Sequence, residues 1–218
     1  MSDIFREVEE DIRRDRYAAL WKKYGDYVVA LVAVLVLGAA GLEIWRYWER
    51  SAREEAARDF HAAVQTAESG NAIAATKDFA KLAEEGPAGY AMLAKFHEAG
   101  QLIVQGKREE AIAIFRTLAQ SRDSMLSGAA RVRLAWALAD FAPREEIETV
   151  VAPLTDPNSA WRFLAREVLA YTAYRTGSAK EAAESYAALA AEQDAPEGVR
   201  TRASAMAEYI KASEGFTP

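Results

Sequence analysis

The hydrophobic residues of this chain are concentrated close to its start. Residues 27–48 read YVVALVAVLVLGAAGLEIWRYW, and the first 16 of them carry no charge. Sixteen helical residues span roughly 24 Å, and aromatic flanks extend this toward the roughly 40 Å of a bilayer with its interfaces. Nothing after Trp48 holds a comparable run. The pattern predicts a transmembrane anchor over residues 27–48.

Aromatic residues flank this segment on both sides, as is typical of the two membrane–water interfaces. The residues expected there are Trp21, Tyr24, Trp45, Tyr47 and Trp48. Two other interpretations stay open: residues 38–41 are small, which suits the cleavage site of a secretory signal, and an apolar helix can also be buried in a core. The long, acid-containing leader and the second aromatic group favour the anchor.

The orientation of the anchor is less strongly encoded. Five basic residues precede it closely and four follow it, which is nearly balanced under the positive-inside rule. An uncleaved N-terminal segment before a long domain commonly keeps its short, lysine-flanked end in the cytoplasm. We therefore expect residues 1–26 inside and residues 49–218 outside.

Residues 1–26 predict a short amphipathic helix. Its apolar residues recur at roughly helical spacing among mixed charges: Ile4, Phe5, Val8, Ile12, Leu20 and Trp21. Such a helix can rest at the membrane interface or dock a cytoplasmic partner. The residues do not decide between the two.

The rest of the chain repeats itself. Four segments align, GNAIAATKDF (70–79), GKREEAIAIF (106–115), APREEIETVV (142–151) and GSAKEAAESY (177–186), and their starts lie 36, 36 and 35 residues apart. The same offsets relate four leucines downstream (Leu82, Leu118, Leu154 and Leu189) and four alanines upstream (Ala63, Ala99, Ala135 and Ala170). A constant register over four copies is the signature of a repeat architecture.

Each unit predicts two helices joined by a turn at Gly70, Gly106, Ala142 or Gly177. Alternating helix pairs of this kind stack into an α-solenoid, and one further helix after the fourth unit would cover its last apolar face. No glycine or proline lies between Leu42 and Gly70, so we expect the anchor helix to continue into the first repeat. The predicted fold is all-α: a transmembrane helix followed by a solenoid over residues 49–218.

Composition narrows the possible functions. The net charge of −6 argues against binding to nucleic acid or anionic lipid, and the absence of cysteine removes disulfides and thiolate chemistry. The two histidines, His61 and His97, occupy equivalent places in FHAA and FHEA, so duplication of the repeat explains both. We find no catalytic or metal-binding motif and predict a protein that is not an enzyme and has no cofactor.

The first helices of such units would line a concave groove. With the turn residue counted as position 15, positions 5, 9 and 12 carry a row of mostly apolar and aromatic residues. The predicted partner-binding residues are Phe60, Phe96, Ile103, Trp136, Tyr171 and Tyr174. Aromatic anchors suit a groove for a hydrophobic segment of another protein. The alternative is that several of them belong to the core.

The repeats resemble tetratricopeptide repeats: alanine follows the turn glycine by five residues and an aromatic residue follows it by nine. The units are longer than the usual 34 residues, and the third has Ala142, Ile147 and Val151 at these places. That unit is degenerate, and its helix pair is expected to be splayed.

The whole chain resembles the YfgM family of bacterial inner-membrane proteins, most sharply in the run WRYW at residues 45–48. The resemblance implies a single-pass inner-membrane protein with a cytoplasmic N-terminus and a periplasmic C-terminal domain. It also implies an ancillary subunit of the SecYEG translocon that links it to a membrane-anchored peptidyl-prolyl isomerase-type chaperone. A periplasmic holdase chaperone and a coordinator of envelope assembly or division are the alternatives.

Overall fold

The computed structural model describes residues 2–214, and for several residues of its first helix, most of them before Trp21, it describes the backbone alone. Every regular element in this range is helical, which confirms the predicted all-α fold. The elements are α1 (Ser2–Glu68), α2 (Ala72–Glu85), α3 (Ala88–Val104), α4 (Arg108–Leu118), α5 (Ser124–Leu138), α6 (Arg144–Val151), the 3-10 helix η1 (Ala152–Leu154), α7 (Arg162–Arg175), α8 (Ala179–Ala191) and α9 (Glu197–Glu214).

The chain divides into two compact units, Met1–Glu54 and Glu55–Pro218. Helix α1 makes up the described part of the first unit and remains helical to Glu68, as the absence of glycine and proline after Leu42 predicts. Near the N-terminus, from Trp21 onward, α1 is long and apolar enough to cross a membrane, and its apolar window is unburied.

The five aromatic residues expected at the membrane interfaces, Trp21, Tyr24, Trp45, Tyr47 and Trp48, all have exposed side chains. Exposure of this kind is what a helix surrounded by lipid requires. The side chains of five residues of the predicted amphipathic helix, Ile4, Phe5, Val8, Ile12 and Leu20, lie outside the described residues.

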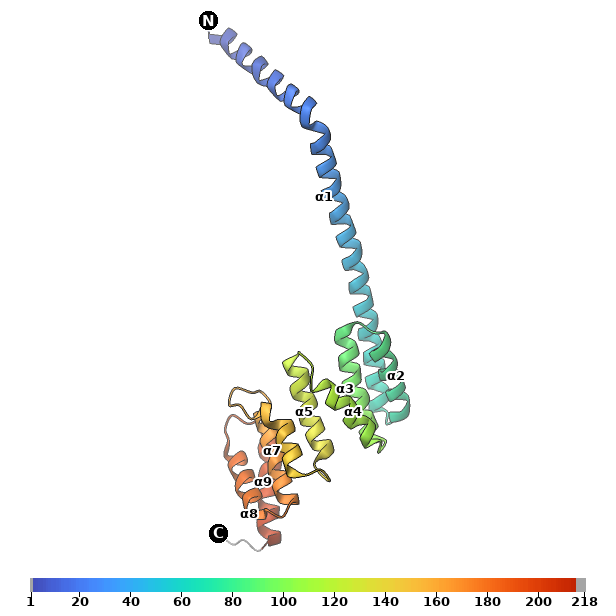
Figure 1. Cartoon of the computed structure of the whole chain (residues 1–218), viewed down its shortest axis with the longest axis vertical. Helices are drawn as coiled ribbons and strands as arrows, with labels where there is room; N and C mark the ends of the chain where they lie inside the picture. The colour runs from blue at the N-terminus through green and yellow to red at the C-terminus, as the bar shows by residue number, and fades with distance from the viewer. Residues whose placement is uncertain (1, 215–218) are drawn as a thin grey trace. The chain divides into compact units, whose positions relative to one another are not determined.

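In the second unit the helices are arranged as successive pairs (Figure 1). The last turns of α1 pair with α2, and α3/α4, α5/α6 and α7/α8 follow, with α9 packed on α8 and α7. The predicted further helix after the fourth unit is therefore present as α9. Helices neighbouring in sequence pack against each other throughout, which is the expected behaviour of a solenoid.

The repeat positions found in the sequence form the core of this unit. The second helices, with η1 in the third unit, bury three sets of equivalent residues. These are Ala75, Ala111, Ile147 and Ala182, then Phe79, Phe115, Val151 and Tyr186, then the four leucines Leu82, Leu118, Leu154 and Leu189. The first helices bury Ala63, Ala99, Ala135 and Ala170. Small residues at these last positions let neighbouring helices approach closely, and larger side chains would force them apart.

The third turn differs from the other three. Gly70, Gly106 and Gly177 adopt positive φ angles of 84°, 76° and 87°, a region open to glycine at little cost. No non-glycine residue in the described chain has a positive φ, so Ala142 takes another path, and Pro143 precedes the short helix α6. The sequence had marked this unit as degenerate.

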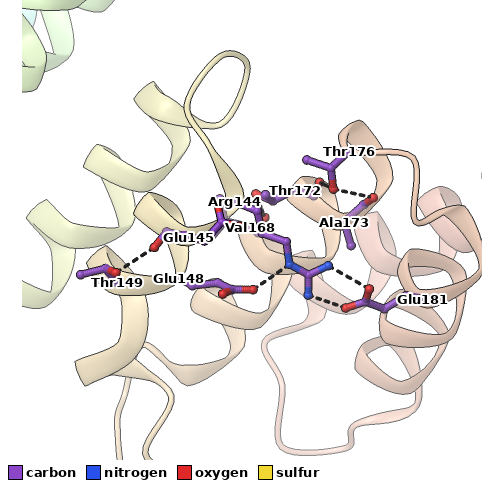
Figure 2. A network of polar contacts seen from close by, with 9 residues as sticks. All are labelled: Arg144, Glu145, Glu148, Thr149, Val168, Thr172, Ala173, Thr176 and Glu181. Carbon is purple, nitrogen blue, oxygen red and sulfur yellow. Dashed lines mark hydrogen bonds and ion pairs between the residues drawn. The ribbon is translucent and has the colours of Figure 1, made fainter.

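Polar contacts join the degenerate third unit to the fourth (Figure 2). Arg144, at the start of α6, donates to both carboxylate oxygens of Glu181 in α8, at 2.6 and 2.9 Å, and to Glu148 at 2.7 Å. These contacts raise the pKa of the guanidinium and lower that of the Glu181 carboxyl. A two-point contact of this kind fixes orientation as well as distance.

Candidate functional site

A pocket of about 930 Å³ lies within the second unit, between the first helices of successive repeats. We call it the groove pocket. Its large apolar and aromatic lining residues come from α3, α5, α7 with the residue before it, α8 and α9: Phe96, Val132, Trp136, Trp161, Leu164, Tyr171, Tyr186 and Met206. A pocket of this size and lining is typical of a binding site with a few placed polar groups.

Trp136 and Tyr171 form the aromatic wall of the groove pocket. Their ring centroids lie 5.5 Å apart at an angle of 46°. The Tyr171 hydroxyl donates to the Asp140 carboxylate at 2.9 Å, and this hydrogen bond raises the pKa of the phenol. Asp140 also pairs with Arg108 at 3.3 Å. The two rings are therefore held in place before any partner arrives, which lowers the entropic cost of binding.

The polar part of the pocket is an ion pair. Glu167 in α7 is 4% exposed and accepts two hydrogen bonds from Arg202 in α9, at 2.7 and 2.8 Å. The contact raises the pKa of Arg202. Burial, and then the charge of Glu167, raises the pKa of the neighbouring Tyr186 phenol, so that hydroxyl stays protonated. A buried carboxylate needs such a partner, because an unpaired charge is strongly disfavoured away from water.

Trp161 closes one side of the pocket and depends on a glycine. A Cβ placed at Gly128 in α5 would lie 2.2 Å from two atoms of the Trp161 indole, Cδ1 and Nε1. The indole therefore packs directly on the backbone of α5, and only glycine leaves room for it. The Nε1 of Trp161 is buried there without a hydrogen-bond partner among the described atoms.

The structure places the six predicted groove residues in different surroundings. Phe96, Trp136 and Tyr171 line the groove pocket together. Phe60 packs against the buried apolar residues that α1 and α2 share, and Ile103 is 37% exposed at the end of α3. The ring centroid of Tyr174 lies 6.2 Å from that of Tyr209 in α9. The last three are not among the residues that line the groove pocket.

Sequence reasoning missed several residues of the candidate site and its support, among them Glu167, Arg202, Trp161 and Gly128. Glu167 occupies position 5 of the fourth unit, the place of Phe60 and Phe96, and Arg202 follows it by a further 35 residues. A charge at an apolar repeat position, matched by the opposite charge one repeat later, was the available signal. Trp161 and Gly128 have no such signal, because they meet only in the folded chain.

Among the other hollows in the described part of the second unit, two have volumes of about 660 and 600 Å³. The first lies over the turn that follows α3 and includes the charged residues Lys107, Arg108 and Arg116. The second lies beneath the loops around Ser121 and Asn158. Neither gathers aromatic side chains from three neighbouring first helices, so the groove pocket is the better candidate.

Residues 18–167 match the family model described as a tetratricopeptide repeat-like domain. The match starts within α1 and ends at Glu167 in α7, while the buried repeat positions continue through α8. Neither a search of curated proteins nor one of solved structures found a match.

Proposed function

The chain belongs to the tetratricopeptide repeat-like domain family, and we propose that it is a membrane-anchored, non-enzymatic scaffold whose groove pocket binds a segment of another protein. Domains of this family mediate protein–protein interaction and are typically non-catalytic. The proposed anchor is residues 27–48, with residues 1–26 in the cytoplasm and residues 49–218 on the opposite side.

The observation that carries this proposal is the groove pocket. Five aromatic side chains and two arginines line it, contributed by several repeats and by α9, and Trp, Tyr and Arg are the residues most enriched at the energetic centres of protein interfaces. Contacts within the solenoid hold the rings of Trp136 and Tyr171 in place, so the binding surface is preorganised for a partner.

Removing the aromatic wall tests the proposal. When the full chain is isolated from membranes in mild detergent, we expect the amount of copurifying partner protein to fall at least about tenfold in a variant carrying Trp136→Ala and Tyr171→Ala. Phe141→Ala is the matched control, since Phe141 is 56% exposed and lies outside the groove pocket. Equal recovery from all three proteins would refute the proposal, and loss of helicity in the double variant would assign the two rings to the core.

The resemblance to the YfgM family supports a more specific form of the proposal. In this form the protein is an ancillary subunit of the Sec translocon in a bacterial inner membrane. Its periplasmic solenoid would link SecYEG to a membrane-anchored peptidyl-prolyl isomerase-type chaperone.

Identification of the copurifying proteins by mass spectrometry tests this specific form. Translocon components should be enriched with the wild-type chain and reduced with the double variant. Partners without any translocon component would reject the Sec assignment and leave the general scaffold proposal standing.

A further inference from the structure

The charges of the groove pocket do not balance. Its charged lining residues are Arg133, Glu167 and Arg202. Glu167 and Arg202 neutralise each other through their two hydrogen bonds. Two arginines against one glutamate leave one positive charge, that of Arg133, in a chain whose net charge is −6.

Arg133 has no acidic partner in the described part of the chain. Its side chain is exposed, and neither a hydrogen bond nor an ion pair joins it to another described residue. Arginines elsewhere on the solenoid bind acids across neighbouring helices, as Arg108 does with Asp140 and Arg166 does with Glu192. Arg133 has only an electrostatic effect on a neighbour, lowering the pKa of His97 after the larger effect of burial.

The unpaired guanidinium stands in α5 three residues before Trp136 and therefore on the same side of the helix. Trp136 in turn packs against Tyr171 with its ring tilted. The pocket thus offers a flat apolar wall and, one helical turn away, a cation with five free N–H donors. Covering that cation with an apolar or basic ligand would remove its water without replacing the hydrogen bonds.

We infer that the groove pocket takes a protein segment in which a large apolar side chain stands close to an aspartate or glutamate. The apolar side chain packs on Trp136 and Tyr171, and the carboxylate binds the Arg133 guanidinium. The inference rests on the function proposed above and names the chemistry of the partner. Charge complementarity of this kind sets which partner binds more than how tightly it binds.

A selection with a random dodecapeptide library tests the inference. The full chain in lipid nanodiscs is the target, alongside Arg133→Glu and Trp136→Ala. Peptides selected on the wild type should pair an aromatic or long aliphatic residue with a nearby acid and bind Arg133→Glu roughly fivefold more weakly. Selection on Arg133→Glu should favour lysine or arginine at the same place.

Arg122→Glu is the matched control, because Arg122 is also exposed, lies outside the groove pocket and changes the net charge equally. It should leave the selected peptides unchanged. Apolar peptides without an acid preference, lost on Trp136→Ala yet unaffected by Arg133→Glu, would overturn this inference and leave the proposed function intact. A selection with no enrichment that depends on Trp136 would overturn both.

Discussion

The first and fourth repeat units use the same position of the repeat in opposite ways. At position 5 the first unit has Phe60, whose ring packs against Phe79 at 5.7 Å, Tyr90 at 6.2 Å and His97 at 5.1 Å between centroids. The fourth unit has Glu167 there, paired with Arg202 of α9. In the first unit this position therefore belongs to an apolar cluster. In the fourth unit it carries a charged side chain that lines the groove pocket.

A position in the repeat therefore does not by itself decide whether a side chain lies in the core or in the groove. The side chains of the helix that packs against the position decide this. Phe60 meets aromatic side chains of α2 and α3, whereas Glu167 meets an arginine from the helix that ends the solenoid. A repeat architecture with nearest-neighbour packing allows such local replacement without disturbing the rest.

The largest expected effect comes from breaking the ion pair of the fourth unit. Arg202→Met leaves Glu167 buried without a partner, and we expect a loss of about 2–3 kcal/mol in the free energy of unfolding. Urea unfolding followed by circular dichroism measures it. Adding Glu167→Leu should restore most of the loss, because it removes the buried carboxylate that Arg202→Met leaves unpaired.

Arg116→Met is the control for that experiment. Its pair with Glu146 spans 2.8 Å, but the two side chains are 55% and 40% exposed. The control should cost at most about 1 kcal/mol. If Arg202→Met costs no more than the control, the fourth unit does not depend on its ion pair and the contrast with Phe60 fails.

A smaller effect is expected from filling the space beside Trp161. Gly128→Ala places a methyl group where the indole lies, and overpacking should destabilise the fold by about 1–3 kcal/mol and displace Trp161 from the pocket. Gly100→Ala in α3 is the matched control, since nothing lies within 4 Å of a Cβ there. That change should be neutral or stabilise by up to about 1 kcal/mol. Equal changes in the free energy of unfolding for the two substitutions would show that the Trp161 indole does not need the space left by Gly128.

His97, which packs against Phe60 of the first unit, should make the stability of the fold depend on pH. Burial lowers the pKa of His97 below its ordinary value of 6.5, with a further contribution from Arg133. The unfolded chain therefore binds the proton more readily, so stability should fall as the pH drops from 7.5 through 6.5. His97→Gln should flatten this part of the thermal stability profile. His61→Gln, at the equivalent but exposed position, should leave the slope in place; a slope that survives His97→Gln would contradict the assignment.

The smallest effect is expected at the contact between the third and fourth units. Arg144→Lys keeps the charge and loses the two-point contact with Glu181, so we expect a loss of about 0.5 kcal/mol. The loss should shrink at high salt, because the pair is partly exposed. A loss well above 1 kcal/mol would mean that polar contacts hold the degenerate unit far more strongly than this geometry suggests.

The sequence predicted the fold more fully than the site. Its register identified the buried alanines and leucines of all four units, and the buried aromatic residues of the first, second and fourth, because each lies at a fixed distance from a turn. The same register correctly predicted that Phe96, Trp136 and Tyr171 lie in a groove. It made the same prediction for Phe60, which does not line the groove pocket, because a repeat position carries no information about the helix packed against it. The packing of Trp161 on Gly128 joins residues 33 positions apart in different units, outside any local pattern.

Site-specific photocrosslinking can show whether the groove pocket contacts another protein in the membrane. A photoreactive benzoylphenylalanine replaces Met206, which lines the groove pocket, or Val104, which is 72% exposed and lies outside it. After illumination of intact membranes, we predict a discrete adduct with another protein from position 206 and none from position 104. Adducts from both positions alike, or from position 104 alone, would contradict a groove that binds a partner segment.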